Sequence, residues 1–106
     1  MNQTTGLTSE EWHDIRSVFF KYPDIERVIL YGSRAMGNYQ PASDIDLTLI
    51  GEDIDLGILS DITFELDDLL LPYKFDLSIY QDISNEALKE HIKRVGIVLY
   101  EKVPVN

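Results

Sequence analysis

Residues 27–50 read RVILYGSRAMGNYQPASDIDLTLI, and this stretch decides the fold. Its first five residues, RVILY, are mostly aliphatic or aromatic, and Gly32 stops the run, which is typical of a short buried strand. Two glycines and a proline lie in residues 32–43, which predicts a loop or one short helical turn. Polar and apolar residues then alternate, which predicts a second strand with one polar and one apolar face. The polar face carries Asp44, Asp46 and Thr48, and the apolar face carries Ile45, Leu47 and Leu49.

Helical periodicity predicts three helices around these strands. The first begins at a capping box formed by Thr8 and Glu11. The second covers residues 55–70, where leucines and isoleucines recur at steps of three and four. The third takes Ser84 as its N-cap and ends at Gly96 in a left-handed conformation.

Two further strands, residues 74–80 and 97–101, complete the predicted fold. The resulting order is α-β-(turn)-β-α-β-α-β, without an internal repeat or a linker between domains. We therefore expect one α+β domain over residues 1–106, with a small mixed β-sheet and helices packed mainly on one face.

Composition and charge exclude several classes of protein. The chain has 9 Lys and Arg against 19 Asp and Glu, a net charge of −10, and no cluster of basic residues, so extended nucleic acid is not an expected ligand. The absence of cysteine excludes disulfide frameworks, thiol nucleophiles and cysteine-based zinc sites. The first six residues lack the regions of a signal peptide, and no stretch reaches ~18 apolar residues. We expect a soluble cytoplasmic protein that does not bind a membrane.

Three acidic side chains are expected to meet on the polar side of the sheet. Residues 74–80 alternate as residues 44–49 do, and two strands whose apolar faces share a core also share a polar face. Asp76 therefore joins Asp44 and Asp46, at cross-strand distances of roughly 4.5–5.5 Å. Carboxylates this close repel one another unless a cation lies between them. Without His or Cys in the group, Mg²⁺ is favoured over zinc, with Mn²⁺ as the alternative, and a pair of such ions typically acts on phosphoryl groups.

The turn after the first predicted strand supplies the anion-binding part of the expected site. Gly32 lets the backbone approach a ligand, and Ser33 with neighbouring N–H groups can hold phosphate oxygens. Arg34 is expected to neutralise a triphosphate, and Ser43, which leads into the carboxylate pair, completes the expected nucleotide-binding group. Phosphates and metal ions are thus expected to meet between this turn and the carboxylates.

At this point the sequence resembles a known family. The spacing of Gly32-Ser33, Asp44-Ile45-Asp46 and a third aspartate on a later strand is similar to that of polymerase-beta-type nucleotidyltransferases. The small form of this family, the minimal nucleotidyltransferase, has the pattern GSRAxG...SDIDL. That pattern is met by Gly32, Ser33, Arg34, Ala35, Gly37, Ser43, Asp44, Ile45, Asp46 and Leu47. The resemblance covers residues 7–102 and includes the run GIVLYE at residues 96–101.

The resemblance implies a fold, a reaction and a role for each acidic residue. The implied fold is the polymerase-beta-like nucleotidyltransferase fold. Asp44 and Asp46 are expected to bind both of two Mg²⁺ ions, Asp76 to bind the catalytic ion and assist deprotonation of the acceptor hydroxyl, and Ser33 to hold the triphosphate. The implied reaction moves a nucleoside monophosphate from a nucleoside triphosphate, with ATP as the expected donor, to a hydroxyl and releases pyrophosphate.

The resemblance also implies a partner, because the chain lacks the helical domain of larger relatives. Minimal nucleotidyltransferases are often encoded beside a small all-helical protein with a HEPN-type ribonuclease fold, with which they form a toxin–antitoxin pair. The acceptor is then a tyrosine of that toxin, in a homo- or hetero-oligomeric assembly. The acidic surface fits a basic, RNA-cleaving partner.

Two other functions stay open at this stage. The chain could be a non-catalytic module that neutralises the helical toxin by occlusion, although the three intact aspartates argue against a decayed site. It could also transfer a nucleotide to a small molecule held at an interface with a helical subunit, as in antibiotic nucleotidyltransferases.

Several conspicuous side chains are assigned no chemistry. The helical positions of His13 and His91 indicate polar-face or core-edge residues. An acidic group in the second helix is interpreted as a solvated face, with a basic partner as the alternative. Three aromatic residues of the first helix exceed what one helix face buries, so part of them is expected at an interface. The acidic group is Glu65, Asp67 and Asp68, and the aromatic group is Trp12, Phe19 and Phe20.

Overall fold

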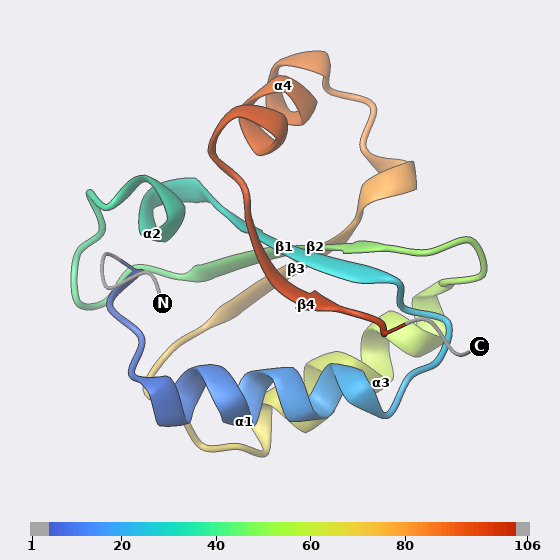
Figure 1. Cartoon of the computed structure of the whole chain (residues 1–106), viewed down its shortest axis with the longest axis horizontal. Coiled ribbons are helices and arrows are strands. Elements are labelled where there is room, and N and C mark those ends of the chain that lie inside the picture. The colour runs from blue at the N-terminus through green and yellow to red at the C-terminus, as the bar shows by residue number, and fades with distance from the viewer. Residues whose placement is uncertain (1–4, 104–106) are drawn as a thin grey trace.

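A four-stranded sheet lies at the centre of the chain. A computed structural model describes residues 5–103; residues 1–4, part of the N-terminal stretch considered above, and residues 104–106 lie outside the described part. The strands occur in the order β3-β2-β1-β4 (Figure 1). They are β1 (Arg27–Tyr31), β2 (Ile45–Ile50), β3 (Phe75–Ile79) and β4 (Ile97–Glu101). β1 is antiparallel to β2 and β4, whereas β2 and β3 are parallel, so the sheet is mixed, as predicted.

The helices follow the predicted order. They are α1 (Ser9–Phe20), α2 (Gly32–Met36), α3 (Leu56–Asp67), α4 (Glu86–Val95) and the short 3-10 helix η2 (Tyr80–Asp82). Of the two possibilities predicted between the first two strands, a loop or one short helical turn, the structure has a short helix, α2, and η2 was not predicted. Within residues 5–103, no helix combines the length and the apolar character needed to cross a membrane.

The caps of the first two long helices agree with the sequence. Thr8 Oγ1 accepts from the Glu11 N–H at 3.0 Å, and Glu11 Oε1 accepts from the Thr8 N–H at 3.0 Å, so the capping box is confirmed. Asp55 caps α3, which ends at Asp67 rather than at the predicted residue 70. Leu70 has φ 58°, in the left-handed region, so it cannot continue the helix as predicted.

Both predicted ends of the last helix need correction. Asn85, not Ser84, is the N-cap, and its Oδ1 accepts from the Leu88 N–H at 3.1 Å. Gly96 is extended, with φ −60° and ψ 141°, rather than left-handed. The glycine is needed for space: a Cβ at Gly96 would lie 2.6 Å from Ile29 Cγ2. A left-handed cap and a close helix–strand approach both favour glycine, so composition alone did not separate them.

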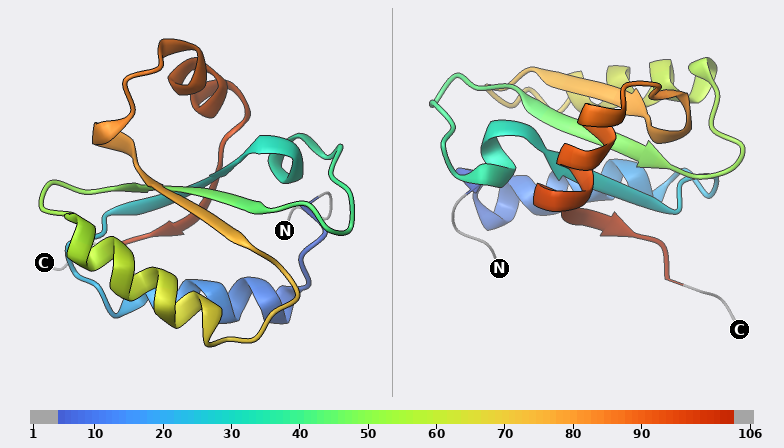
Figure 2. Two further views of the ribbon diagram at one scale, coloured as in Figure 1. Left: turned by 180° about the vertical axis from the view of Figure 1, so that it is seen from behind. Right: turned by 90° about the horizontal axis from the view of Figure 1, so that it is seen from above.

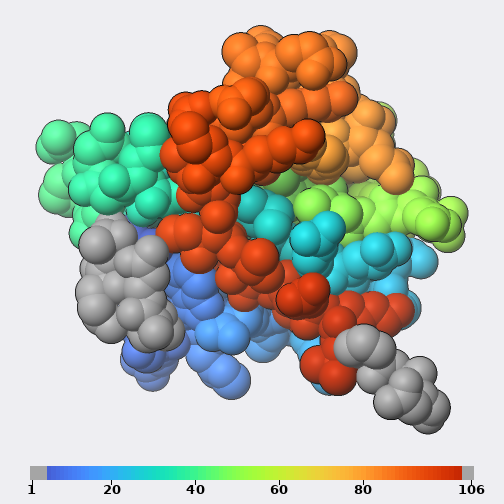
Figure 3. All heavy atoms as spheres, turned by 45° about the horizontal axis from the view of Figure 1, so that its top comes forward, coloured from blue at the N-terminus to red at the C-terminus, as the bar shows by residue number. Residues whose placement is uncertain are grey.

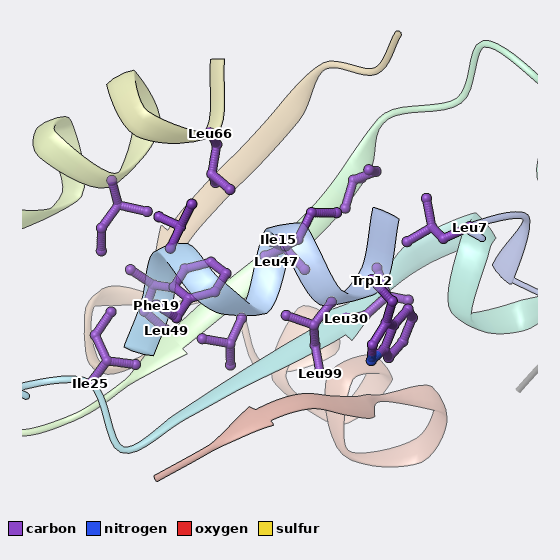
Figure 4. Packing of buried hydrophobic residues seen from close by; sticks show 14 residues of the cluster. Leu7, Trp12, Ile15, Phe19, Ile25, Leu30, Leu47, Leu49, Leu66 and Leu99 are labelled. Carbon is purple, nitrogen blue, oxygen red and sulfur yellow. The ribbon is translucent and has the colours of Figure 1, made fainter. Parts of the chain in front are cut away.

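One face of the sheet carries the main hydrophobic core. α1 and α3 lie side by side across this face (Figure 2). The predicted apolar face of β2 is confirmed, because the side chains of Ile45, Leu47 and Leu49 are fully buried there. The core, drawn in Figure 4, consists of Leu7, Trp12, Ile15, Val18, Phe19, Ile25, Val28, Leu30, Ile45, Leu47, Leu49, Ile62, Leu66 and Leu99.

α4 lies on the opposite face and forms a smaller apolar cluster. Its Ile92 packs with Ile29 and Tyr31 of β1. The prediction of helices mainly on one face therefore holds for the large core, with α4 as the exception. Thr48, which the alternation placed on a polar face, is fully buried, and its hydroxyl donates to the Ser78 carbonyl at 3.4 Å.

The aromatic residues of α1 divide as their spacing predicts. Trp12 and Phe19 are buried, whereas Phe20 is 78% exposed. Phe20 and Val98 line a hollow of about 630 Å³ between α1 and β4. Figure 3 shows β4 at the surface between α4 and α1.

The acidic group of α3 is partly engaged within the chain. Lys21 Nζ lies 2.7 Å from Glu65 Oε1, and the Tyr22 hydroxyl donates to the same carboxylate. This hydrogen bond raises the pKa of Tyr22 to about 12. Glu65 thus joins α1 to α3, whereas Asp67 and Asp68 are exposed, as expected of a solvated face.

Candidate active site

Two of the three expected aspartates are neighbours in the sheet. Asp46 of β2 and Asp76 of β3 are register partners in the parallel pair, each at the second position of its strand. Asp44 immediately precedes β2. Asp46 is half-buried, whereas Asp44 and Asp76 are exposed. β2 and β3 both start at the end of the sheet where α2 lies (Figure 2, left).

The electrostatics of Asp46 reflect this crowding. Burial raises the pKa of Asp46 to about 6, and the negative charges of Asp76 and Asp44 raise it as well. A positive charge on His91, which the ring carries only when it is protonated, acts in the opposite direction. A cation bound beside Asp46 would therefore be favourable, because it would offset the negative charges gathered there.

The donor set suits a hard divalent cation, although the ligands are not gathered into a finished cluster. Three carboxylates without sulfur or imidazole ligands match the oxygen preference of Mg²⁺ and Mn²⁺. Among residues 5–103, no group of three or more His, Cys, Asp or Glu side chains is arranged closely enough to hold a metal ion. The exposure of Asp44 and Asp76 leaves both free to turn toward Asp46.

Gly32 brings the backbone directly against Asp46. It opens α2 with φ 77°, in the left-handed region that favours glycine. A Cβ at this position would overlap Asp46 Oδ2. The close approach expected of Gly32 is therefore present, and its neighbour in this structure is the carboxylate.

Ser33 follows as the second residue of α2. Its carbonyl oxygen accepts from the N–H groups of Gly37, at 2.9 Å, and Asn38, at 3.2 Å. Its side chain is half-buried, and its hydroxyl makes no hydrogen bond with any residue of the described range 5–103. Ser33 thus follows directly on Gly32, the residue whose backbone lies against Asp46.

Arg34 differs from the expectation, because its guanidinium is turned into the protein. The side chain is 1% exposed. It donates to the carbonyl oxygens of Thr5 at 2.9 Å, Ser43 at 3.0 Å and Pro41 at 3.3 Å. Its Cζ lies 4.7 Å from the ring centre of Tyr73. In this structure Arg34 ties the loop before β2 to the chain, with little surface left for a triphosphate.

Ser43 belongs to the same loop. Its Oγ accepts from the Gln40 N–H at 2.7 Å, and its N–H donates to the Gln40 carbonyl at 2.9 Å. These two bonds close a turn of four residues. Ser43 therefore shapes the entry to β2 and directly precedes Asp44.

Sequence reasoning missed one residue of this site. His91 of α4 lies with Nε2 3.2 Å from the Gly32 nitrogen, where it accepts the N–H. The signal was its place in α4: His91 precedes the buried Ile92 and lies three residues after Leu88, which also packs in the small cluster. A histidine at the edge of the inward stripe faces the sheet, but nothing in the pattern identifies what it touches there.

Comparisons with known proteins identify a family for this chain. The family described as "Polymerase beta, Nucleotidyltransferase" matches residues 13–104. None of the curated proteins compared with the chain matched it.

Similar folds occur in solved toxin–antitoxin structures. A chain in the crystal structure of a toxin–antitoxin with AMP-PNP is 20% identical, with a TM-score of 0.71 over 86% of this chain and 73% of that chain. A chain of the toxin–antitoxin MntA-HepT is 18% identical, with a TM-score of 0.67 over 90% and 74% of the two chains. A third structure holds a tri-AMPylated HEPN toxin from Shewanella oneidensis in complex with an MNT antitoxin. One of its chains is 18% identical, with a TM-score of 0.59 over 86% and 73%.

Proposed function

Because the chain belongs to the polymerase-beta nucleotidyltransferase family, we propose that it transfers AMP from ATP to a hydroxyl of a partner protein. The observation that carries this proposal is the pairing of Asp46 with Asp76 directly beside the Gly32–Ser33 turn. The arrangement brings acidic ligands next to a backbone turn that suits phosphate, as phosphoryl transfer requires.

Asp44, Asp46 and Asp76 would hold the divalent ions, two Mg²⁺ with Mn²⁺ as the alternative. Bound there, the ions would neutralise the triphosphate and the charge that develops on the leaving group. The raised pKa of Asp46 supports this assignment, because burial and the charges of Asp76 and Asp44 disfavour the carboxylate, and a bound cation would offset both effects.

The remaining steps use groups of this chain. Ser33 would hold the triphosphate through its hydroxyl, which makes no hydrogen bond with residues 5–103. The acceptor oxygen attacks the α-phosphorus, and the bond from this phosphorus to the oxygen that bridges to the β-phosphate breaks, which releases pyrophosphate. Asp76 is exposed, so it can accept the proton of an acceptor hydroxyl that arrives from outside.

We propose that the acceptor is a tyrosine of a small helical HEPN-type ribonuclease toxin encoded nearby, so that the chain acts as its antitoxin. Support comes from the similar folds in a toxin–antitoxin with AMP-PNP and in a complex of a tri-AMPylated HEPN toxin with an MNT antitoxin. The net charge of −10 suits a basic partner that cleaves RNA.

The test combines the chain, ATP labelled at the α-phosphate, Mg²⁺ and the HEPN-type protein encoded next to it. We expect label on a tyrosine of that protein and inhibition of its ribonuclease activity. The double variant Asp44→Asn/Asp46→Asn should lower the labelling rate by at least about 100-fold. A matched control, Asp67→Asn/Asp68→Asn, removes the same charge from an exposed part of the chain and should label as the wild type does.

Other outcomes would identify the alternative functions. If the Asp44→Asn/Asp46→Asn variant neutralises the toxin without labelling it, the chain acts by occlusion. If label appears on a small molecule instead, the acceptor proposal is wrong and the transferase proposal stands. If the wild type labels nothing with either Mg²⁺ or Mn²⁺, the transferase proposal itself is wrong.

A further inference from the structure

His91 makes a contact that joins α4 to the start of α2. Its Nε2 lies 3.2 Å from the Gly32 nitrogen and accepts the backbone N–H. The first N–H groups of a helix have no acceptor within the helix, so an outside group must satisfy them. For Gly32 that group is an imidazole 59 residues further along the chain.

The contact lies at the tightest point of the candidate site. The Gly32 backbone is so close to Asp46 that a Cβ there would overlap Oδ2 of the carboxylate. Asp46 therefore bounds Gly32 on one side, and the hydrogen bond to His91 holds its N–H. Ser33 is the next residue, so the position of its hydroxyl depends on how firmly Gly32 is held.

The imidazole itself is held in place. Its ring meets the ring of Tyr31 edge-on, with 6.2 Å between centroids and an interplanar angle of 81°. Tyr31 is 8% exposed and is the register partner of Asp46 on β1. The neighbouring Ile92 anchors α4 in the small apolar cluster. His91 thus reaches Gly32 from a support that is packed against the same sheet.

We propose that His91 is a positioning residue for the transfer reaction: by accepting the Gly32 N–H it sets the Ser33 turn relative to Asp46. An accepting Nε2 carries no hydrogen, so the hydrogen of the neutral ring is on Nδ1. This inference deepens the proposed function and rests on it for its effect on rate. The contact itself can be measured without any transfer.

The first test reads the contact by NMR. The chain has two histidines, so His13→Gln leaves His91 as the single imidazole. Two-bond ¹H–¹⁵N correlations should show the neutral ring with hydrogen on Nδ1, and the Gly32 amide proton should shift upfield in His91→Phe. A ring with hydrogen on Nε2, or an unmoved Gly32 amide in His91→Phe, would overturn the inference.

The second test separates the acceptor from the ring. His91→Phe keeps an aromatic ring beside Tyr31 but has no acceptor, whereas His91→Gln replaces the ring and keeps a carbonyl acceptor. We expect His91→Phe to lower the AMP transfer rate by about 10- to 100-fold, the scale of a small misplacement of reacting groups. His91→Gln should recover most of that loss and restore the Gly32 amide shift.

The matched control is His13→Phe. His13 is exposed on α1, so this substitution should leave the transfer rate unchanged. His91 has no positioning role if His91→Phe transfers AMP as fast as the wild type. The same conclusion holds if His91→Gln is as slow as His91→Phe while the circular dichroism spectra of both variants match that of the wild type. A wild type that fails to transfer AMP refutes the proposed function, whereas an unmoved Gly32 amide refutes the contact. The two failures are therefore read from different measurements.

Discussion

The two faces of the sheet differ in how many apolar residues they bury. Within residues 5–103, fourteen buried residues form the core under α1 and α3, whereas three form the cluster under α4. β2 contributes to both: Leu47 is fully buried on the first face, and its neighbour Asp46 is half-buried on the second.

The difference teaches where this chain can tolerate charge. Apolar burial stabilises the folded state, and most of it lies on the α1 and α3 face. A buried charge is costly, and the more open face beside α4 leaves the carboxylates partly in solvent. Stability and the candidate chemistry are thus separated across a single sheet.

The largest expected effect tests the core face. Phe19 is fully buried, so Phe19→Ala should lower the free energy of unfolding by about 3–5 kcal/mol. Phe20→Ala is the matched control, because Phe20 is 78% exposed and should change it by less than about 0.5 kcal/mol. Urea titration measures both. Equal losses would contradict the assignment of the two rings.

The next prediction concerns Arg34 and asks whether this residue stabilises the fold or binds phosphate. It lies next to Ser33 in the sequence, yet its guanidinium binds carbonyl oxygens of Thr5, Pro41 and Ser43. Arg34→Met leaves these acceptors without partners and should cost about 2–3 kcal/mol of unfolding free energy. The exposed Arg16→Met should cost less than about 1 kcal/mol, by the same titration. If Arg34→Met is as stable as the wild type but no longer binds ATP, Arg34 binds the triphosphate, as the sequence predicted.

A pair of identical substitutions compares the two faces directly. Ile62 is fully buried under α3, and Ile92 is 5% exposed under α4. We expect Ile92→Ala to cost about 2 kcal/mol, near the low end for such changes, and Ile62→Ala to cost more. Thermal unfolding of both variants tests this order. The comparison between the faces is wrong if Ile92→Ala is the more damaging.

The smallest expected effect has the opposite sign. The folded pKa of Asp46, about 6, is above its usual value of 3.8, so the folded state binds the proton more tightly and stability falls as the pH rises between these values. Asp46→Asn removes this cost and should raise the metal-free unfolding free energy at pH 7–8 by about 1–2 kcal/mol, allowing for solvent screening.

The gain should vanish below about pH 4, because the Asp46 carboxyl is then protonated in both states. Unfolding curves at pH 3.5, 5 and 7.5 follow the change. Asp67→Asn, at an exposed position, should change stability by less than about 0.5 kcal/mol. A loss of stability in Asp46→Asn at pH 7.5 would show that the carboxylate stabilises the face on which it lies.

Local patterns predicted the elements and the carboxylate pair, because strand alternation and helix caps depend on nearby residues. Matching polarity predicted that Asp76 lies on the same face of the sheet as Asp46, and the structure adds that the two are register partners in a parallel pair. The N-cap at Asn85 was missed by one residue, since Ser84 has the same capping chemistry.

What could not be predicted depends on distant contacts. The strand order β3-β2-β1-β4 is a tertiary property, and so is the burial of Thr48. Nothing local distinguishes an arginine that binds phosphate from Arg34, whose acceptors are backbone carbonyls. His91 meets Gly32 across 59 residues, and periodicity does not specify such a partner.

The parallel pairing of β2 with β3 has a consequence for how the protein is made. Asp46 and Asp76 lie on strands joined through α3, and parallel strands can pair only after such a crossover has been completed. Long-range pairing is slow compared with helix formation. A chain in which β3 has not yet docked on β2 therefore lacks the pairing of Asp46 with Asp76, and the acidic site is complete only once the sheet is.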